Sequence, residues 1–340
     1  MADDGAIRVK NKKVLITGGT GFIGSRLSLK CLERGDSVRV LGQVNTTVEA
    51  SNKELAEAAG AQVILGSVTD REVIDEALSG VDVVFHLAAA QHEANVPDQH
   101  FWDVNVTGTK NVLEASVASG VKRLVHGSTI GVYGSAPEGT LDEHSPVAPD
   151  NIYGVTKLEG ERLVISYLDR LPVVLIRISE TYGPGDRRLL KLFNAIDKGR
   201  FFMIGSGNNL HHPVYIDDLI EGFLLAARVD EAIGKTLVLA GKEPVSTNTM
   251  AHTIADQLGK KIPGFRAPLT PFLLFAQVVG KSCGSLGIQP PIHPRRMDFF
   301  KKSLVFSQEE ARQTLGYAPK YSFEHGVHKT AAWYREMGHL

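Results

Sequence analysis

Short apolar runs alternate with longer amphipathic stretches through the first half of the chain. The short runs are rich in valine, isoleucine and leucine, which is typical of parallel strands buried on both faces. The stretches between them place apolar residues every three or four positions, which predicts helices. Regular alternation of the two predicts a doubly wound parallel sheet in an α/β fold. The predicted strands are 14–16, 37–41, 62–66, 83–87, 123–126 and 173–177, and the main helices span 22–35, 71–78 and 103–119.

A glycine-rich turn joins the first predicted strand to the first helix, where residues 17–24 read T-G-G-T-G-F-I-G. Without Cβ atoms, such a turn lets backbone N–H groups and the helix N-terminus approach a pyrophosphate. Because the motif lies between a strand and a helix, we favour dinucleotide binding in a Rossmann-type fold over a purely structural turn. The predicted cofactor contacts are Gly18, Thr20, Gly21, Phe22, Ile23 and Gly24, joined by Leu87, Ala88 and Ala89 after the fourth strand.

The end of the second strand leaves the choice between NAD and NADP open. An NAD site usually has an acidic residue there, which binds the hydroxyl groups of the adenosine ribose. This chain has Gly42 and Gln43 instead, so no carboxylate repels a 2′-phosphate and no arginine follows directly to attract one. Arg26 and Arg39 are the nearby candidates for a phosphate contact. We expect Gln43 to contact the cofactor in either case.

The pattern changes after the sixth strand, where the chain should enter a smaller substrate lobe. Residues 237–241 are expected to form a strand that returns to the first sheet. Residues 263–294 are apolar and rich in Pro and Gly, and we expect them to fill the core of the second lobe. They could instead wall an apolar pocket or touch a membrane surface. The predicted domains are 1–180 with 214–242 for NAD(P) binding, and 181–213 with 243–340 for the C-terminal substrate lobe, where 308–315 and 325–336 have helical patterns.

Composition excludes several classes of partner. Lys plus Arg number 37 against 38 for Asp plus Glu, so no net field attracts nucleic acid or an anionic membrane. The two cysteines, Cys31 and Cys283, cannot form a disulfide framework and suit a reducing cytoplasm. The N-terminus lacks the apolar core of a signal peptide, and the apolar stretch 272–280 is too short to span a bilayer. We therefore expect a cytoplasmic protein with a small-molecule substrate, no nucleic acid and no integral membrane segment.

Tyr153 and Lys157 lie four residues apart on a predicted helix, so one turn brings them to the same face. A tyrosine normally ionises at about pH 10, and a neighbouring cation favours the phenolate and lowers that pKa. On its own such a pair is usually a surface feature. Here the fifth strand runs into Ser128 and Thr129, two hydroxyls at the edge where open α/β sheets bind ligands. Although such hydroxyls are often caps, we favour a role in orienting the substrate.

At this point the chain resembles an extended short-chain dehydrogenase/reductase of the epimerase/dehydratase group, across nearly its whole length. The resemblance implies that Tyr153 is the acid/base and that Lys157 lowers its pKa and binds the nicotinamide ribose. It also implies that Thr129 binds the reacting oxygen, that Asn105 supports the site, that NAD is slightly favoured over NADP, and that the protein is a homodimer through helices beginning near Asp103 and Tyr153. The matching motifs are T-G-G-T-G-F-I-G (17–24), H-L-A-A (86–89), N-V-T-G-T (105–109), S-T-I-G-V-Y-G (128–134), Y-G-V-T-K (153–157), Y-G-P-G (182–185), V-Y-I-D-D-L (214–219) and L-G-Y-A-P (315–319).

One departure from the family pattern narrows the chemistry. Sugar-nucleotide dehydratases and glucuronate decarboxylases carry acidic side chains where this chain has Ile130 and Gly131. Neither residue can transfer a proton, so simple oxidoreduction, or epimerisation through a transient ketone, is expected.

Other departures lie near the expected substrate. Glu180 stands where sugar-nucleotide enzymes usually have asparagine, and its carboxylate would oppose a diphosphate unless it is paired. The cations of 187–191 could pair with it or with a phosphate, or form a solvated helix face. Residues 211–213 replace an arginine that grips phosphate, and because adjacent histidines on an extended chain point different ways, we predict no metal site. Asp217 and Asp218 are expected to cap a helix. The candidate substrate residues are Ser128, Glu180, Arg188 and His212.

Three functional hypotheses remain open. The leading one is an NAD(P)-dependent epimerase or dehydrogenase that acts at a secondary alcohol of a nucleotide sugar, which the overall resemblance and the basic residues 187–191 favour. The second is a 3β-hydroxysteroid-dehydrogenase-like enzyme on an apolar alcohol or ketone, which Glu180, the missing arginine and the apolar stretch favour. The third is a non-catalytic dinucleotide sensor, against which the intact Thr129, Tyr153 and Lys157 argue. The sequence decides neither the substrate nor the direction of reaction.

Overall fold

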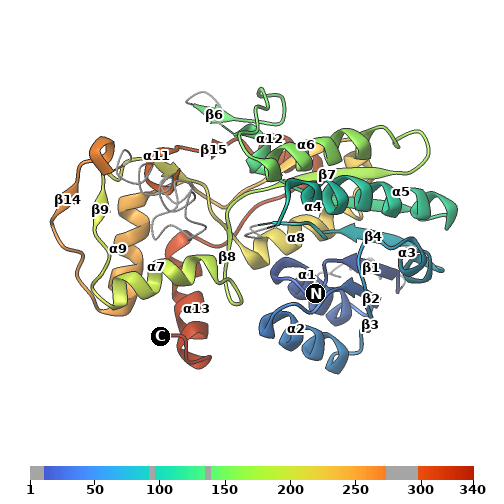
Figure 1. Cartoon of the computed structure of the whole chain (residues 1–340), viewed down its shortest axis with the longest axis horizontal. Helices are drawn as coiled ribbons and strands as arrows, with labels where there is room; N and C mark the ends of the chain where they lie inside the picture. The colour runs from blue at the N-terminus through green and yellow to red at the C-terminus, as the bar shows by residue number, and fades with distance from the viewer. Residues whose placement is uncertain (1–10, 92–95, 135–138, 273–297) are drawn as a thin grey trace, which may run out of the picture.

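The computed structural model describes residues 11–91, 96–134, 139–272 and 298–340 (Figure 1). The described residues form a seven-stranded parallel sheet with the strand order β12-β7-β5-β4-β1-β2-β3. This confirms the predicted fold class, all six predicted strands, and the later strand that returns to the same sheet. The strands are β1 (Lys13–Thr17), β2 (Ser37–Gly42), β3 (Gln62–Leu65), β4 (Val83–His86), β5 (Arg123–Thr129), β7 (Val173–Ile178) and β12 (Thr236–Leu239).

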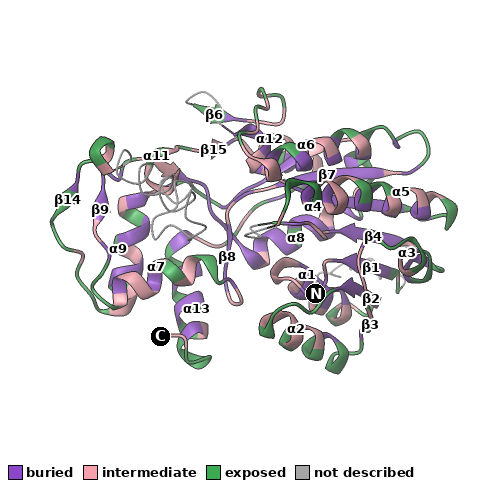
Figure 2. Ribbon diagram, in the orientation of Figure 1, coloured by how far each residue is buried: buried purple, intermediate pink, exposed green. Residues whose placement is uncertain are grey.

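The strands of the sheet are mostly buried (Figure 2). Side chains that alternate along them build one core on each face of the sheet. On β1, Val14 and Ile16 belong to the core beneath α1 and α8, whereas Leu15 belongs to the core beneath α3, α5 and α6. Both faces are covered, which explains why the strands read as continuous apolar runs rather than alternating ones. The covering helices are α1 (Phe22–Glu33), α2 (Thr47–Ala58), α3 (Arg71–Leu78), α5 (Thr109–Ala118), α6 (Ile152–Ile165), α8 (Ile216–Ala226) and α12 (Glu309–Leu315).

The long helix predicted over 103–119 is divided by a change in helical winding. It begins as α4 (Asp98–Trp102), continues as a π-helix at Asp103–Gly108, and becomes α5 afterwards. Turns of π-helix are rare and often lie at functional sites. Asn105 lies within this turn, buried beside α6.

A second lobe lies beside the sheet and is built around three helices, α7 (Arg188–Asp197), α9 (Thr247–Leu258) and α13 (Phe323–Glu336) (Figure 1). Phe193 of α7 packs edge-on against Tyr334 of α13. The predicted C-terminal helices are confirmed as α12 and α13. Short strand pairs complete the lobe and its junction with the sheet: β8 (Thr181–Tyr182) with β11 (Val214–Tyr215), β9 (Met203–Ile204) with β14 (Arg266–Ala267), β10 (Leu210–His211) with β13 (Val245–Ser246), and β6 (Thr140–Leu141) with β15 (Val305–Phe306).

The prediction that Asp217 and Asp218 cap a helix was wrong. Helix α8 already begins at Ile216, and no side chain caps it. The Asp218 carboxylate instead accepts hydrogen bonds from the backbone N–H groups of Lys320 and Tyr321, so it ties the C-terminal segment to the sheet domain. A long-range role of this kind leaves no local signal in the sequence.

Two predictions lie largely outside the described residues, because 273–297 are not described. These are the possible helix at 272–280 and the placement of the apolar stretch 263–294. Cys283 also falls there, whereas Cys31 is a buried free thiol. In the part of the chain that the structure describes, no helix is long and apolar enough to cross a membrane. The domain boundaries stay a prediction.

Candidate active site

A cavity of about 610 Å³ opens at the carboxyl ends of the strands, where the strand order reverses between β1 and β4. Open α/β sheets bind their ligands at this point. Its walls come from the glycine turn, the ends of β2, β4 and β5, the start of α6, and the segment after β7. The predicted site residues that line it are Gly18, Thr20, Gly21, Phe22, Ile23, Gly24, Gln43, Leu87, Ala88, Ala89, Ser128, Thr129, Tyr153, Glu180 and Arg188. Lys157 and His212 are not among the lining residues.

The glycine turn has the shape that a dinucleotide pyrophosphate requires. Gly18 has a φ of 70°, and a Cβ atom there would come within 2.7 Å of the Ala88 backbone nitrogen. A Cβ atom on Gly24 would overlap the Gly18 carbonyl. Gly21 is the N-cap of α1 and no side chain caps this helix, so the first helical N–H groups are left for a ligand. The residues of this turn therefore fit a bound dinucleotide.

The end of the cavity near β2 holds no cation for a 2′-phosphate among the described residues that line it. Arg39 is engaged elsewhere, because its guanidinium donates to the carbonyls of Ala77 and Ser79 at 2.6 and 3.1 Å. Arg26 lies 3.7 Å from the Asp217 carboxylate and does not line the cavity. Neither candidate from the sequence therefore faces the cofactor. Glu49 lines this end and is held in the capping box of α2.

Thr129 and Tyr153 meet at the cavity wall and share a side-chain hydrogen bond. The Thr129 hydroxyl also accepts from the Gly131 N–H at 3.0 Å, which caps the short helix Ile130–Tyr133. Ser128 points the other way, because its hydroxyl donates to Glu161 at 2.6 Å. Alternation along β5 thus puts one of the two predicted hydroxyls beside the tyrosine and the other in a buried network.

Lys157 is nearly fully buried, with 2% of its surface exposed, and its head group lies against β5. Its ammonium group donates to the Gly127 carbonyl at 2.7 Å and lies 3.3 Å from the His126 Nε2 atom. Burial lowers the pKa of Lys157 to about 8, with Glu161 acting in the opposite direction. The predicted side-by-side arrangement on the helix is therefore present, but the lysine head group binds the strand behind the site.

The pKa of Tyr153 departs from its usual value in the direction opposite to the prediction. Burial raises it to about 12, while the hydrogen bond with Thr129 and the charge of Arg188 act to lower it. The physical reason is that the loss of hydration on burial outweighs both of these stabilising interactions. The phenol of the free protein is therefore protonated at neutral pH.

Asn105 links three structural elements beside the cavity. Its side-chain oxygen accepts from the Ala90 N–H at 2.9 Å, and its amide nitrogen donates to Thr156 of α6 at 3.0 Å. His86 lies behind it, between the hydroxyls of Thr17 and Thr109 at 2.7 and 3.0 Å. The π-helix, α6 and the end of β4 are thus held together by buried hydrogen bonds.

Sequence reasoning missed a buried ion pair directly beneath the site. Glu161 and Arg177 meet at 2.9 Å, and both side chains are less than 10% exposed. Glu161 also accepts from Ser128, and Arg177 donates to the Tyr133 hydroxyl at 2.9 Å. A signal was available for Glu161, because residues 153, 157 and 161 follow one another at four-residue steps along one helix face.

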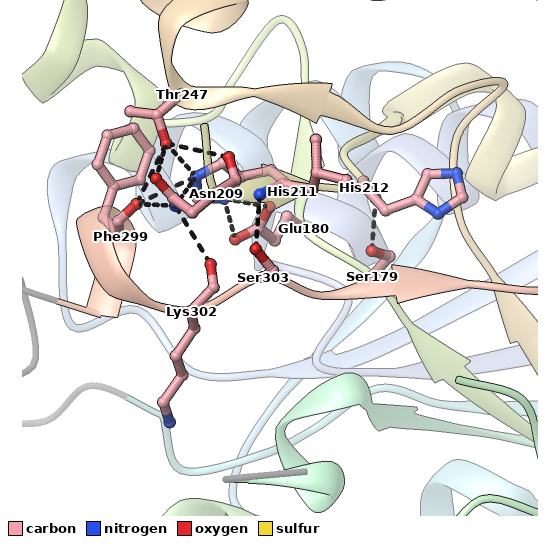
Figure 3. Close-up of polar contacts among 10 residues, drawn as sticks. Ser179, Glu180, Asn209, His211, His212, Thr247, Phe299, Lys302 and Ser303 are labelled. Carbon is pink, nitrogen blue, oxygen red and sulfur yellow. Dashed lines mark hydrogen bonds and ion pairs between the residues drawn. The ribbon is translucent and has the colours of Figure 1, made fainter. Parts of the chain in front are cut away.

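Glu180 is paired with a histidine rather than with an arginine (Figure 3). Its carboxylate lies 3.1 Å from the Nδ1 atom of His211. Arg188 donates instead to the Thr181 carbonyl at 2.6 Å. His212 points away from His211, as predicted, and contacts the Gly241 carbonyl and the Phe306 N–H. Across the residues that the structure describes, no group of three or more His, Cys, Asp or Glu side chains is placed to hold a metal ion.

Comparison with known proteins assigns this site to a family. A sequence model described as the NAD dependent epimerase/dehydratase family matches residues 14–240. The chain belongs to this family. It is therefore an NAD(P)-dependent enzyme of the extended short-chain dehydrogenase/reductase type, with NAD or NADP as cofactor. The resemblance inferred from the motifs is confirmed.

The relatives within the family differ in what they act on. A 3-beta-hydroxysteroid dehydrogenase of Mycolicibacterium neoaurum is 28% identical over 98% of this chain and 94% of its own length. A dTDP-glucose 4,6-dehydratase of Streptomyces niveus is 29% identical over 95% of this chain and 93% of its own. The crystal structure of a UDP-glucuronic acid 4-epimerase from Bacillus cereus in complex with NAD aligns with a TM-score of 0.77 and 26% identity, covering 96% of this chain and 99% of that one.

Proposed function

We propose that the protein transfers a hydride between NAD(P) and a secondary alcohol or its ketone, with Tyr153 as the acid/base. The observation that carries this proposal is the hydrogen-bonded pair of Thr129 and Tyr153 on the wall of a cavity that also contains the glycine turn. A tyrosine on an exposed helix face would not line the same cavity as the glycine turn, as Tyr153 does. The proposed cofactor contacts are the predicted ones that line the cavity: Gly18, Thr20, Gly21, Phe22, Ile23, Gly24, Gln43, Leu87, Ala88, Ala89 and Tyr153.

Each polar group has a defined task in this proposal. Tyr153, protonated in the free protein, donates a proton to the oxygen of a ketone and takes it back from an alcohol. Thr129 positions that oxygen through its hydroxyl. Bound NAD(P) supplies or accepts the hydride. Lys157 is proposed to bind the nicotinamide ribose, as the family resemblance implies, through an N–H donor that the Gly127 carbonyl does not use.

The neutral residues Ile130 and Gly131 argue against dehydration and decarboxylation at this site. Ile130 lines the cavity, and the Gly131 N–H is bound to the Thr129 hydroxyl. Neither offers the carboxylate that dehydration or decarboxylation requires beside the tyrosine. Oxidation, reduction, or epimerisation through a transient ketone therefore remains.

A nucleotide sugar is the substrate class that we favour. The objection that Glu180 would repel a diphosphate is weakened, because His211 pairs with its carboxylate. Arg187 and Arg188 line the same end of the cavity and offer positive charge. A hydroxysteroid is the second candidate, supported by the relative from Mycolicibacterium neoaurum.

Assays of hydride transfer test this function directly. We expect the purified protein with NAD⁺ to produce reduced nicotinamide, or an epimer detectable by NMR, from UDP- or dTDP-sugars and not from 3β-hydroxysteroids. Turnover of a steroid alone would establish the second candidate. Binding of NADH without turnover of any alcohol in either class would instead indicate a dinucleotide sensor.

We further propose that NAD is preferred over NADP. Glu49 lines the adenosine end of the cavity, and the described lining residues there include no Arg or Lys. A 2′-phosphate would therefore meet a carboxylate without a compensating cation. We expect NADH to bind at least about tenfold more tightly than NADPH, measured by nicotinamide fluorescence, which corresponds to about 1.4 kcal/mol. Equal affinities would contradict this preference.

Two further expectations stay predictions. The homodimer rests on the family resemblance, and exposed Val155 and Ile165 on α6 are compatible with a helix-to-helix interface. Sedimentation as a monomer would refute it. A cytoplasmic location likewise stays a prediction.

A further inference from the structure

A carboxylate with unused acceptor capacity faces the cavity at the end opposite the adenosine site. The Glu180 side chain is 42% exposed and lines the same cavity as Tyr153, whereas the side chain of its partner His211 is only 5% exposed. Among the described residues, His211 supplies the hydrogen bonds of this carboxylate, through Nδ1 at 3.1 and 3.2 Å from its two oxygens (Figure 3). An ionised carboxylate can accept about four hydrogen bonds, so most of its capacity remains open.

The groups around the His211 ring favour its protonated form. Nδ1 faces the Glu180 carboxylate, and Nε2 lies 3.1 Å from the Phe299 carbonyl oxygen. Carboxylate and carbonyl oxygens only accept hydrogen bonds, so a ring with protons on both nitrogens satisfies both neighbours. The nearby Thr247 hydroxyl donates to Asn209, which leaves its lone pairs for Nε2. Three separate segments therefore position this ring, as Figure 3 shows.

The electrostatics of the pair agree with this geometry. Burial acts to lower the pKa of His211, but the charge of Glu180 and the hydrogen bonds to Glu180 and Phe299 outweigh it and raise the pKa. Burial acts to raise the pKa of Glu180, but the charges of His211, Arg188 and His212 outweigh it and lower the pKa. Both shifts favour the charged forms of the pair, and the carboxylate presented to the cavity is anionic at neutral pH.

We propose that Glu180, oriented by His211, binds a second donor group of the substrate, a hydroxyl or amino group other than the one that reacts. This inference rests on the proposed function, because it places the reacting oxygen at Tyr153 and Thr129. It specifies the substrate class as an alcohol with at least one further hydrogen-bond donor, as in a sugar. An apolar alcohol with a single hydroxyl offers no donor to the acceptor positions of Glu180 that His211 leaves open.

Binding measurements with a deoxy series test the proposal without relying on turnover. The full-length protein saturated with NADH is titrated calorimetrically with UDP-glucose and with its 2-, 3-, 4- and 6-deoxy analogues. We expect one analogue, lacking a hydroxyl that does not react, to bind roughly 10- to 100-fold more weakly to the wild-type protein, as for a lost hydrogen bond to a charged group.

The Glu180→Gln variant identifies the residue responsible. It should bind UDP-glucose roughly 10- to 100-fold more weakly, yet bind that one analogue within about threefold of the wild type, because both have lost the same contact. NADH affinity should not change. Glu231→Gln makes the same chemical change on an exposed residue away from the cavity and should match the wild type throughout.

Several results would overturn the proposal. One is a deoxy series in which removal of no single hydroxyl weakens binding to the wild-type protein by tenfold. This measurement can be made even if the Glu180 variant is insoluble. Another is an equal loss of affinity for all five sugars in Glu180→Gln, which would indicate that the pair only supports the lobe. Failure of the wild type to bind any of the five sugars also overturns it. Tight, Glu180-dependent binding without hydride transfer would refute the proposed function alone.

Discussion

Replacing Tyr153 with phenylalanine should lower the rate of hydride transfer by about 10²- to 10⁴-fold, the usual contribution of a positioned general acid or base. The variant loses only the hydroxyl that shares a hydrogen bond with Thr129, and the ring still fills the cavity wall. The glycine turn is untouched, so the affinity for NADH should stay within about threefold of the wild type. Rate is measured as formation of reduced nicotinamide, and affinity as its fluorescence on binding.

A matched control separates loss of the catalytic hydroxyl from loss of any buried tyrosine hydroxyl. Tyr167 lies just beyond the C-terminal end of α6, in the core beneath α3, α5 and α6. Tyr167→Phe should keep wild-type turnover. If Tyr153→Phe also keeps it, the proton passes through another group and the proposed mechanism fails.

Replacing Arg177 with methionine should destabilise the fold by about 3–5 kcal/mol, the cost of leaving a buried charge without its partner. Glu161 would remain beneath the sheet with its carboxylate unpaired, because Arg177 supplies two of its hydrogen bonds. The change also removes the contacts of Arg177 with the Tyr133 hydroxyl and the Glu143 carbonyl. The measurement is the free energy of unfolding from urea titration at neutral pH.

Two further variants test whether the loss of stability in Arg177→Met comes from a buried unpaired charge. Adding Glu161→Gln to Arg177→Met should recover part of the lost stability, since no buried charge is then left unpaired. Arg162→Met breaks the exposed ion pair with Glu159 on the same helix and should cost less than about 1 kcal/mol. Equal losses for Arg162→Met and Arg177→Met would show that burial does not govern the effect.

Local patterns were sufficient to predict the first domain, because its strands and helices have strong and separate signals. Runs such as 14–16 are apolar at every position since both faces of the strand are covered, and the glycine turn lies between a strand and a helix. Helix α9 and most of the short strands of the second lobe were not predicted, because such elements depend strongly on their tertiary contacts.

The candidate site was predicted in part. Fixed spacing placed Tyr153 and Lys157 on one helix face, and the position of Thr129 at a strand end brought it to the cavity. The direction in which each polar head group points was not predictable. Lys157 binds the Gly127 carbonyl, and Ser128 turns to Glu161 although it is adjacent to Thr129.

The sequence by itself determined the family and the cofactor class, because these depend on residue type and spacing along a few continuous segments. Only the tertiary structure decided how the charges are paired. Glu180 pairs with His211, 31 positions away, and the Asp218 carboxylate binds the backbone N–H of Lys320, 102 positions away. Such partners are chosen by the packing of distant segments, and the pKa values of buried groups follow from that packing rather than from neighbours in the chain.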